Sequence, residues 1–232
     1  MNSSELLEKI KSTGYWRVNV RPTVFDANRI PHLSDCWETI ESTQTRLRGW
    51  DFPHIDPDYR LNQDDSIESG VDSMDIKEYW RFYQSGQFIH YTAFIEDYHE
   101  LSWQSSMYAG GKPDKYLEII STLYRLTEIY EFAARLASRT ILSPGATVSI
   151  KLVGTEGRHL VFEHIRRLLS RPYRCKLPEI NLERTYAEPE LRGEASALAL
   201  TAAVHVYERF NWNDPPREVF AEDQKKLLER RF

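Results

Sequence analysis

Cysteine is scarce in this chain, which has 232 residues and two cysteines. A small secreted domain held together by disulfides needs more cysteines at close spacing. Neither Cys36 nor Cys175 belongs to a Cys-x-x-Cys pair or to a zinc-binding pattern. The sequence therefore predicts two reduced thiols in a cytoplasmic protein.

Long apolar runs are missing as well. The longest one, residues 195–207, is interrupted by Ser196, Thr201 and His205, whereas a helix that crosses a bilayer needs about 20 apolar residues. Residues 1–11 read as a short polar helix without the apolar core of a signal peptide. We therefore expect no membrane partner.

The familiar sequence templates for catalysis are absent. There is no G-x-S-x-G turn, no Walker-type phosphate loop and no H-E-x-x-H helix, and residues 149–151 read Ser-Ile-Lys where a nuclease of one common type has Glu-x-Lys. His54, Asp56 and Asp58 are metal-ligand types at alternate positions, and residues 96–100 form a weaker case, but both segments fit solvated turns. We expect no metal and no cofactor.

Charge is unevenly distributed along the chain, whose formal net charge is −5. Acidic residues dominate residues 51–78, and basic residues dominate residues 157–177. A negative total argues against general nucleic-acid binding, which depends on neutralising phosphates. The basic segment is nevertheless a candidate for nucleic-acid contact. Its arginines are Arg158, Arg166, Arg167, Arg171 and Arg174.

The patterns that are present predict one α+β domain spanning residues 1–232. Strands occur in clusters with helices between them, which favours a mostly antiparallel sheet covered by helices. A strand-rich half spans about residues 14–100, and a helix-rich half spans about residues 114–230. The predicted strands are residues 15–22, a meander at 66–96 with an aromatic hairpin, residues 146–153 and an extended segment at 177–187. The predicted helices are residues 32–47, 114–138, 190–210 and 216–230, the two long ones buried and the last one amphipathic. Residues 48–65 and 97–113 are expected to be irregular, and residues 160–169 fit a helix or a strand.

Two segments carry the candidate binding residues. The loop at residues 48–54 contains Arg48, Trp50, Asp51 and His54, which combine a guanidinium, an indole, a carboxylate and an imidazole. The alternative for this loop is structural, with Trp50 and Phe52 inserted in the core and Arg48 paired with Asp51.

The hairpin adds Arg81 and Tyr83, which share one face of a predicted strand. Arginine and tyrosine are enriched at binding hot spots. The alternative is an ordinary solvated sheet face.

The long helix at residues 114–138, for which Asp114 is the expected N-cap, carries charges inside an apolar sequence. Arg125 and Glu128 are three residues apart, and Glu131 and Arg135 are four apart, so each pair lies on neighbouring turns. In a buried helix such charges either form ion pairs or line a polar pocket. Both interpretations stay open at this point.

Four stretches, GYWRVNVRPTVFDANRI, TRLRGWDFPHI, EYWRFYQSGQFIHY and LYRLTEIYEFAARLA, together resemble a region at the C-terminal end of some bacterial ATP-binding regulators. Those regulators carry a Schlafen-like (AlbA-type) domain in front. The resemblance runs from about residue 14 to the C-terminal helices and implies a role in bacterial regulation or defence. It supplies no catalytic residue. No Schlafen-like or nucleotide-binding domain precedes the region in this sequence, so the resemblance does not assign to it any function of that part.

The leading hypothesis is a non-catalytic recognition module that binds a protein partner or a small anionic ligand through the 48–54 loop and the hairpin. A hydrolase or nuclease that uses Asp51, His54 or Glu128 as general base is the second hypothesis. A concave pocket that gathers Arg48, His54 and a helix acid favours the enzyme, whereas a flat patch with exposed Trp50 and Tyr83 favours the binder.

Overall fold

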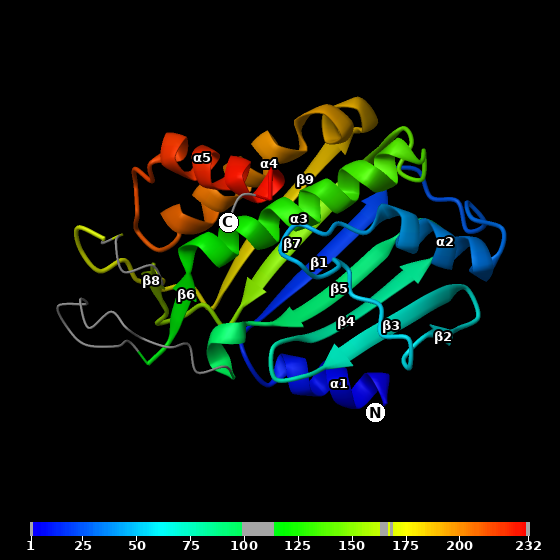
Figure 1. The fold of residues 1–232 in the computed structure, drawn as a ribbon, viewed down its shortest axis with the longest axis horizontal. Coiled ribbons are helices and arrows are strands. Elements are labelled where there is room, and N and C mark those ends of the chain that lie inside the picture. Colours follow the sequence, from blue (N-terminus) through cyan, green and yellow to red (C-terminus); the bar gives the residue numbers. More distant parts are fainter. Residues whose placement is uncertain (1, 99–113, 163–166, 168, 231–232) are drawn as a thin grey trace.

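The chain folds around one seven-stranded antiparallel sheet with helices on both faces, in a computed structural model that describes residues 2–98, 114–162, 167 and 169–230 (Figure 1). In spatial order the strands are β2 (Leu61–Asn62), β3 (Ser66–Asp72), β4 (Lys77–Tyr83), β5 (Phe88–Ala93), β1 (Tyr15–Pro22), β7 (Gly145–Val153) and β9 (Glu179–Ala187). A separate two-stranded parallel pair joins β6 (Tyr116–Glu118) to β8 (His159–Val161). The helices are α1 (Ser3–Lys11), α2 (Leu33–Thr43), the 3-10 turn η1 (Ile95–Asp97), α3 (Ile119–Ser138), α4 (Glu188–Glu208) and α5 (Arg217–Leu228). The predicted α+β class with a mostly antiparallel sheet is confirmed.

Strand β1 lies inside the sheet because its side chains alternate strictly. Trp16, Val18 and Val20 are buried on the helical face, while Arg17 and Arg21 are exposed on the other face. The strand pairs with β5 on one side and β7 on the other. Strands from both halves of the sequence therefore build the same sheet, and the core is continuous between them.

Helix α3 runs diagonally across the buried face of the sheet (Figure 1). Its apolar residues cover most of its circumference, as expected for a central helix. It packs against α4, where Ala195, Ala199 and Ala202 are buried and leave room for close approach. Helix α3 begins at Ile119 rather than at Asp114, because residues 116–118 pair with β8 as a strand and Glu118 becomes the N-cap.

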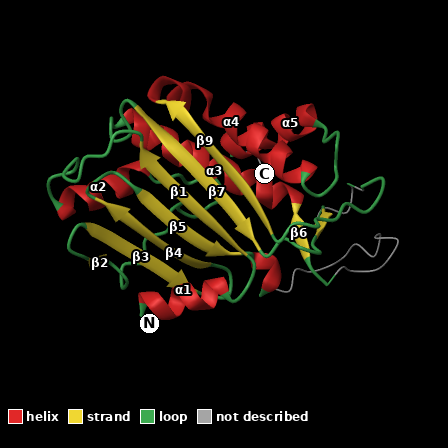
Figure 2. Cartoon of the chain, turned by 180° about the vertical axis from the view of Figure 1, so that it is seen from behind, coloured by secondary structure: helices red, strands yellow, loops and turns green. Residues whose placement is uncertain are grey.

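The opposite face of the sheet is covered only in part. Leu6 and Ile10 of α1 pack against Tyr79 and Ala93, and thereby cover β3, β4 and β5. Figure 2 shows that β1, β7 and β9 have no helix in front of them on this side. The helical face therefore contains the main core, and α1 anchors a smaller apolar cluster.

Several predicted boundaries need correction. Helix α2 ends at Thr43 rather than near residue 47, because Thr45 turns to pair with Phe52 across the loop. Strand β8 occupies residues 159–161 of the ambiguous segment, and most of the predicted irregular segment, residues 99–113, lies outside the described residues. None of the described helices combines the length and the apolar character needed to cross a bilayer.

Candidate functional site

A cavity of about 550 Å³ opens at the end of the sheet where α3 begins. Its described wall comes from the 48–54 loop, Trp16 of β1, the turn between β3 and β4, η1 with the end of β5, and β6 with the first two turns of α3. We call it the α3 cavity. Its lining residues are Trp16, Arg48, Trp50, His54, Val71, Ser73, Asp75, Ile76, Thr92, Ala93, Ile95, Glu96, Tyr98, Leu117, Glu118, Ser121, Thr122 and Arg125. This volume is within the range of pockets that bind small molecules.

The 48–54 loop is fixed to the sheet by buried contacts. Phe52 is fully buried and contacts the rings of His90 and Phe132, with centroids 5.0 and 5.8 Å away. The indole of Trp80 donates a hydrogen bond of 2.6 Å to the carbonyl of His54, and the amide of His54 donates one of 2.8 Å to Glu78. The loop therefore presents its remaining side chains from a rigid base.

Arg48 is a structural member of the site. Its guanidinium makes two hydrogen bonds, of 2.9 and 2.6 Å, with Glu128, whose side chain is fully buried. Asp51 pairs with Arg46 instead, so the expected pairing of Arg48 with Asp51 is wrong. Trp50 is 40% exposed and lies against Arg48, with 4.7 Å from the guanidinium carbon to the ring centroid, so it is not inserted in the core.

Arg125 differs from Arg48, because its guanidinium has few partners. It contacts Glu128 at 3.5 Å and makes no hydrogen bond with any described residue. Its side chain is 15% exposed, and it lines the α3 cavity. Burial lowers the pKa of Arg125, against the opposing effect of Glu128. A guanidinium with five donors and so few partners is suited to binding an anion.

A second buried pair lies on the sheet behind these arginines. Nε2 of His90 is 3.4 Å from Glu78, and both side chains are almost fully buried. Burial opposes ionisation of Glu78, but His90 and Arg125 outweigh it and lower the pKa of that carboxyl. The two arginines at the cavity are therefore balanced by two buried carboxylates, Glu78 and Glu128.

Acidic residues gather at the start of α3. Glu118 caps the helix by accepting a hydrogen bond from the amide of Ser121, and Glu96 accepts one of 3.0 Å from the amide of Glu118. Burial raises the pKa of Glu96, and no cation lies within ion-pair distance of it among the described residues. Thr122, on the next turn, is 2% exposed, and its hydroxyl has no hydrogen-bond partner among the described residues.

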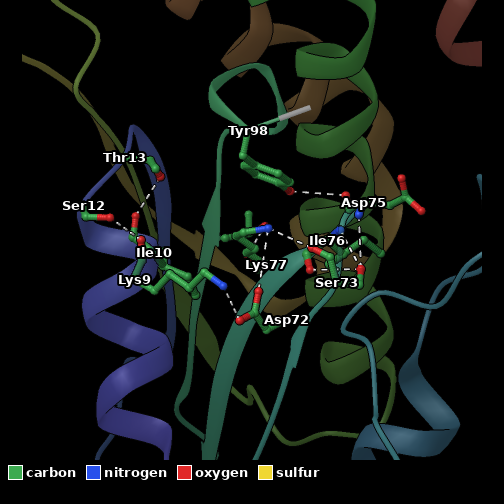
Figure 3. A network of polar contacts seen from close by, with 11 residues as sticks. Lys9, Ile10, Ser12, Thr13, Asp72, Ser73, Asp75, Ile76, Lys77 and Tyr98 are labelled. Carbon is green, nitrogen blue, oxygen red and sulfur yellow. Dashed lines mark hydrogen bonds and ion pairs between the residues drawn. The ribbon is translucent and has the colours of Figure 1, made fainter. Parts of the chain in front are cut away.

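The outer edge of the cavity is held by a polar network around Lys77 (Figure 3). The ammonium of Lys77 donates a hydrogen bond to the carbonyl of Ser73, pairs with Asp72, and lies 3.8 Å from the centroid of Tyr98. Lys9 of α1 pairs with the same Asp72 at 2.5 Å, and the Tyr98 hydroxyl donates to the carbonyl of Asp75. Burial raises the pKa of Tyr98 to about 12, so this hydroxyl is a neutral donor at physiological pH.

Arg81 and Tyr83 do not contribute to the cavity. They alternate along β4 with Glu78 and Trp80, which contact the 48–54 loop, so they point to the opposite face of the sheet. Arg81 is bound there to Glu68, which also accepts hydrogen bonds from Tyr79 and from Ser3 of α1. The predicted single surface formed by the loop and the hairpin is therefore not formed, and Arg81 anchors α1.

The described arginines of the basic segment have contacts within the fold. Arg158 is 1% exposed and pairs with Asp97 at 2.5 Å, and Arg167 pairs with Asp223. The guanidinium of Arg171 lies over the ring of Tyr173, and Arg174 donates to the carbonyl of Gly157. Arg166 lies outside the described residues. Most of these charges therefore have partners within the fold.

The charged residues of α3 were expected either to form ion pairs or to line a polar pocket, and the structure contains examples of both. Arg125 and Glu128 form the predicted ion pair, but Glu128 is bound more closely to Arg48. Glu131 accepts a hydrogen bond from Ser196, and Arg135 donates to the carbonyl of Gln44, so these two residues have other partners in the described structure. No group of three or more His, Cys, Asp or Glu side chains able to hold a metal ion occurs within the described ranges.

Neither a protein-family model, nor a curated protein, nor a solved structure matches this chain. The chemistry of the α3 cavity is therefore the basis for assigning a function. Sequence reasoning identified Arg48, Trp50 and His54 in its wall, and it identified Arg125 as a charge to be explained. It considered Glu96 only within the weaker metal-ligand segment at residues 96–100, and it missed Thr122, for which the available signal was its position just inside the long helix.

Proposed function

We propose that this domain binds a small organic anion in the α3 cavity, with Arg125 as the group that holds the acid. The observation that carries the proposal is the guanidinium of Arg125, which lines a cavity and makes no hydrogen bond with any described residue. A partly buried guanidinium that contacts Glu128 at 3.5 Å, without a hydrogen bond to a described residue, keeps donors available for water or a ligand. A carboxylate matches the planar fork of an arginine and can form two parallel hydrogen bonds with it.

The wall of the cavity on α3 adds a second polar group. Arg125 is on the second turn of the helix. Thr122, whose buried hydroxyl has no partner among the described residues, supplies a further hydrogen-bonding group on the same wall. The cavity therefore offers an anion two kinds of donor.

The wall also contains apolar and aromatic side chains. Trp16, Trp50 and Tyr98 contribute rings, while Ile95 and Leu117 contribute aliphatic surface. Pockets of this composition bind organic molecules by burying an apolar body and fixing its orientation through a few polar groups. An organic acid with a hydrophobic body therefore fits better than an inorganic anion.

Hydrolysis is the second candidate function, because the α3 cavity gathers Arg48, His54 and the helix acid Glu118 in one concave wall. Of the candidate general bases, Asp51 is paired with Arg46 and Glu128 is bound to Arg48. His54 is the one that lines the cavity, and its Nδ1 is buried without a hydrogen-bond partner among the described residues. Incubating the protein with ester and amide derivatives of any acid that binds, and measuring product release, tests this candidate.

The proposed function is tested by thermal unfolding in the presence of paired compounds. Aromatic carboxylic acids are compared with their methyl esters, which have nearly the same shape but no charge. An acid present at a hundredfold excess over its Kd should stabilise the folded state by about 2.7 kcal/mol. The ester and the variant Arg125→Gln should each lose most of that stabilisation.

Arg21→Gln is the matched control, because Arg21 is exposed on the other face of the sheet. That variant should respond to the acids as the wild type does. Equal stabilisation by acids and esters, or an unchanged response in Arg125→Gln, would contradict the proposal.

A further inference from the structure

The α3 cavity contains two charged groups of opposite sign that lack adequate partners and do not pair with each other. Arg125 makes no hydrogen bond with a described residue. The carboxyl of Glu96 accepts a backbone hydrogen bond from Glu118 and has no described cation within ion-pair distance. Both side chains line the cavity. A ligand with one charge can satisfy only one of them.

The two groups lie at different depths along α3. The carboxyl of Glu96 is held at the amide of Glu118, the N-cap, whereas Arg125 is seven residues further along the helix. Seven residues correspond to about 10 Å along the helix axis. Because helical side chains lean toward the N-terminus, the guanidinium lies closer to the start of the helix than its Cα does. The charges that the ligand must match are therefore separated by several ångströms.

We infer that the ligand of the α3 cavity is amphoteric, with a carboxylate for Arg125 and an ammonium group for Glu96, separated by about the length of a dipeptide. This inference rests on the proposed function and adds the positive charge and the spacing. Each residue of an extended chain spans at most about 3.6 Å, so the termini of a dipeptide are farther apart than the charges of a single α-amino acid. The rings of Trp50 and Tyr98 provide surface for aromatic side chains.

The charges of the cavity also argue against a phosphate dianion. Glu96 is an acid in the wall, and the other arginine that lines the cavity, Arg48, is already bound to Glu128. A ligand with two negative charges would be repelled by the carboxylate of Glu96. A ligand with one charge of each sign is attracted at both ends.

Isothermal titration with three forms of the same aromatic dipeptides tests the inference. The panel comprises Phe-Phe, Trp-Gly and Gly-Trp as free zwitterions, as N-acetyl derivatives and as C-terminal amides. We expect at least one free dipeptide to bind. Its N-acetyl and amide forms should each bind about tenfold more weakly or worse, since each lacks one charge-assisted hydrogen bond.

The variant Glu96→Gln separates the two charges. It keeps the shape of the side chain and removes the negative charge, so it should weaken binding of the free dipeptide and leave binding of the N-acetyl form unchanged. Glu183→Gln, on the exposed edge strand β9, is the matched control and should behave as the wild type.

The outcomes distinguish this inference from the proposed function. If the N-acetyl form binds as tightly as the free dipeptide, the ligand is a simple acid, and the inference is wrong while the proposed function stands. If the C-terminal amide binds as tightly, the role of Arg125 is wrong. If none of the three forms binds while the paired aromatic acids stabilise the protein, the inference alone is overturned.

Discussion

Two largely buried arginines of this domain have very different surroundings. Arg158 is 1% exposed and donates from all three guanidinium nitrogens, to the carbonyls of Gly154 and Tyr116 and to the carboxylate of Asp97. It also lies over the ring of Phe94, 4.6 Å from the centroid. Arg125 is 15% exposed, faces a cavity and has one ion pair at 3.5 Å. The difference shows which buried charge serves the fold and which is available to a ligand.

The physical reason is the cost of burying a charge. A guanidinium removed from water destabilises the folded state unless hydrogen bonds and an opposite charge compensate for its lost hydration. At Arg158 the fold provides that compensation in full. At Arg125 it does so incompletely, and the missing contacts can come from solvent or from a bound molecule in the cavity.

Replacing Arg158 with methionine should give the largest effect. Asp97 would lose its ion-pair partner, and two carbonyls would lose their donors, although the amide of Gly14 would still donate to Asp97. We expect a loss of about 3–5 kcal/mol in the free energy of unfolding, measured by urea denaturation. A loss below about 1 kcal/mol would mean that Arg158 contributes no more to the stability of the fold than Arg125 does.

Arg125→Met should cost much less stability. Glu128 retains both hydrogen bonds from Arg48, and the methionine still fills the space of the arginine stem. We expect the free energy of unfolding to change by about 1 kcal/mol or less. Urea denaturation without ligand checks this value, and a loss as large as that of Arg158→Met would mean that Arg125 is structural.

Replacing Glu96, the acid at the other end of the α3 cavity, should have the smallest effect on the free energy of unfolding. Burial raises the pKa of Glu96, so its protonated form is favoured in the folded state. Proton binding by Glu96 therefore stabilises the folded state at low pH. This stabilisation is lost as the pH rises through the pKa that Glu96 has in the folded state. Glu96→Gln resembles the protonated form at every pH. In the absence of ligand it should be more stable than the wild type at pH 7, by about 1 kcal/mol or less.

That difference should disappear at acidic pH, where the wild-type carboxyl is protonated in both the folded and the unfolded state. Urea denaturation of both proteins across this pH range makes the measurement. A variant that is less stable than the wild type at pH 7 would show that the ionised carboxylate contributes to the fold. In that case Glu96 would not be available to a ligand.

Much of the fold could be predicted from the sequence because it depends on local periodicity. The alternation in residues 15–22 identified β1 to the residue, and the apolar pattern of residues 114–138 identified the central helix, which begins five residues later, at Ile119. The pairing of residues 116–118 with β8 was not predictable, because it depends on a partner more than 40 positions away. Strand order and the sharing of one sheet by both halves also depend on such distant contacts.

The α3 cavity was harder to predict, because the side chains that line it come from several segments that are far apart in the sequence. The loop residues Arg48, Trp50 and His54 were identified by their chemistry, since chemistry is local information. Glu128, which binds Arg48, is 80 positions away in the sequence, and no spacing rule links the two residues. Arg81 and Tyr83 were wrongly grouped with the loop, because the sequence does not show which face of β4 the loop covers.

The most direct test of the account is a crystal structure of the domain with a bound aromatic carboxylic acid. The account predicts the carboxylate in the α3 cavity, with its oxygens about 2.7–3.0 Å from the guanidinium nitrogens of Arg125 and the ring beside Trp50 or Tyr98. An acid bound elsewhere, with Arg125 still lacking a hydrogen-bonded anion, would contradict it.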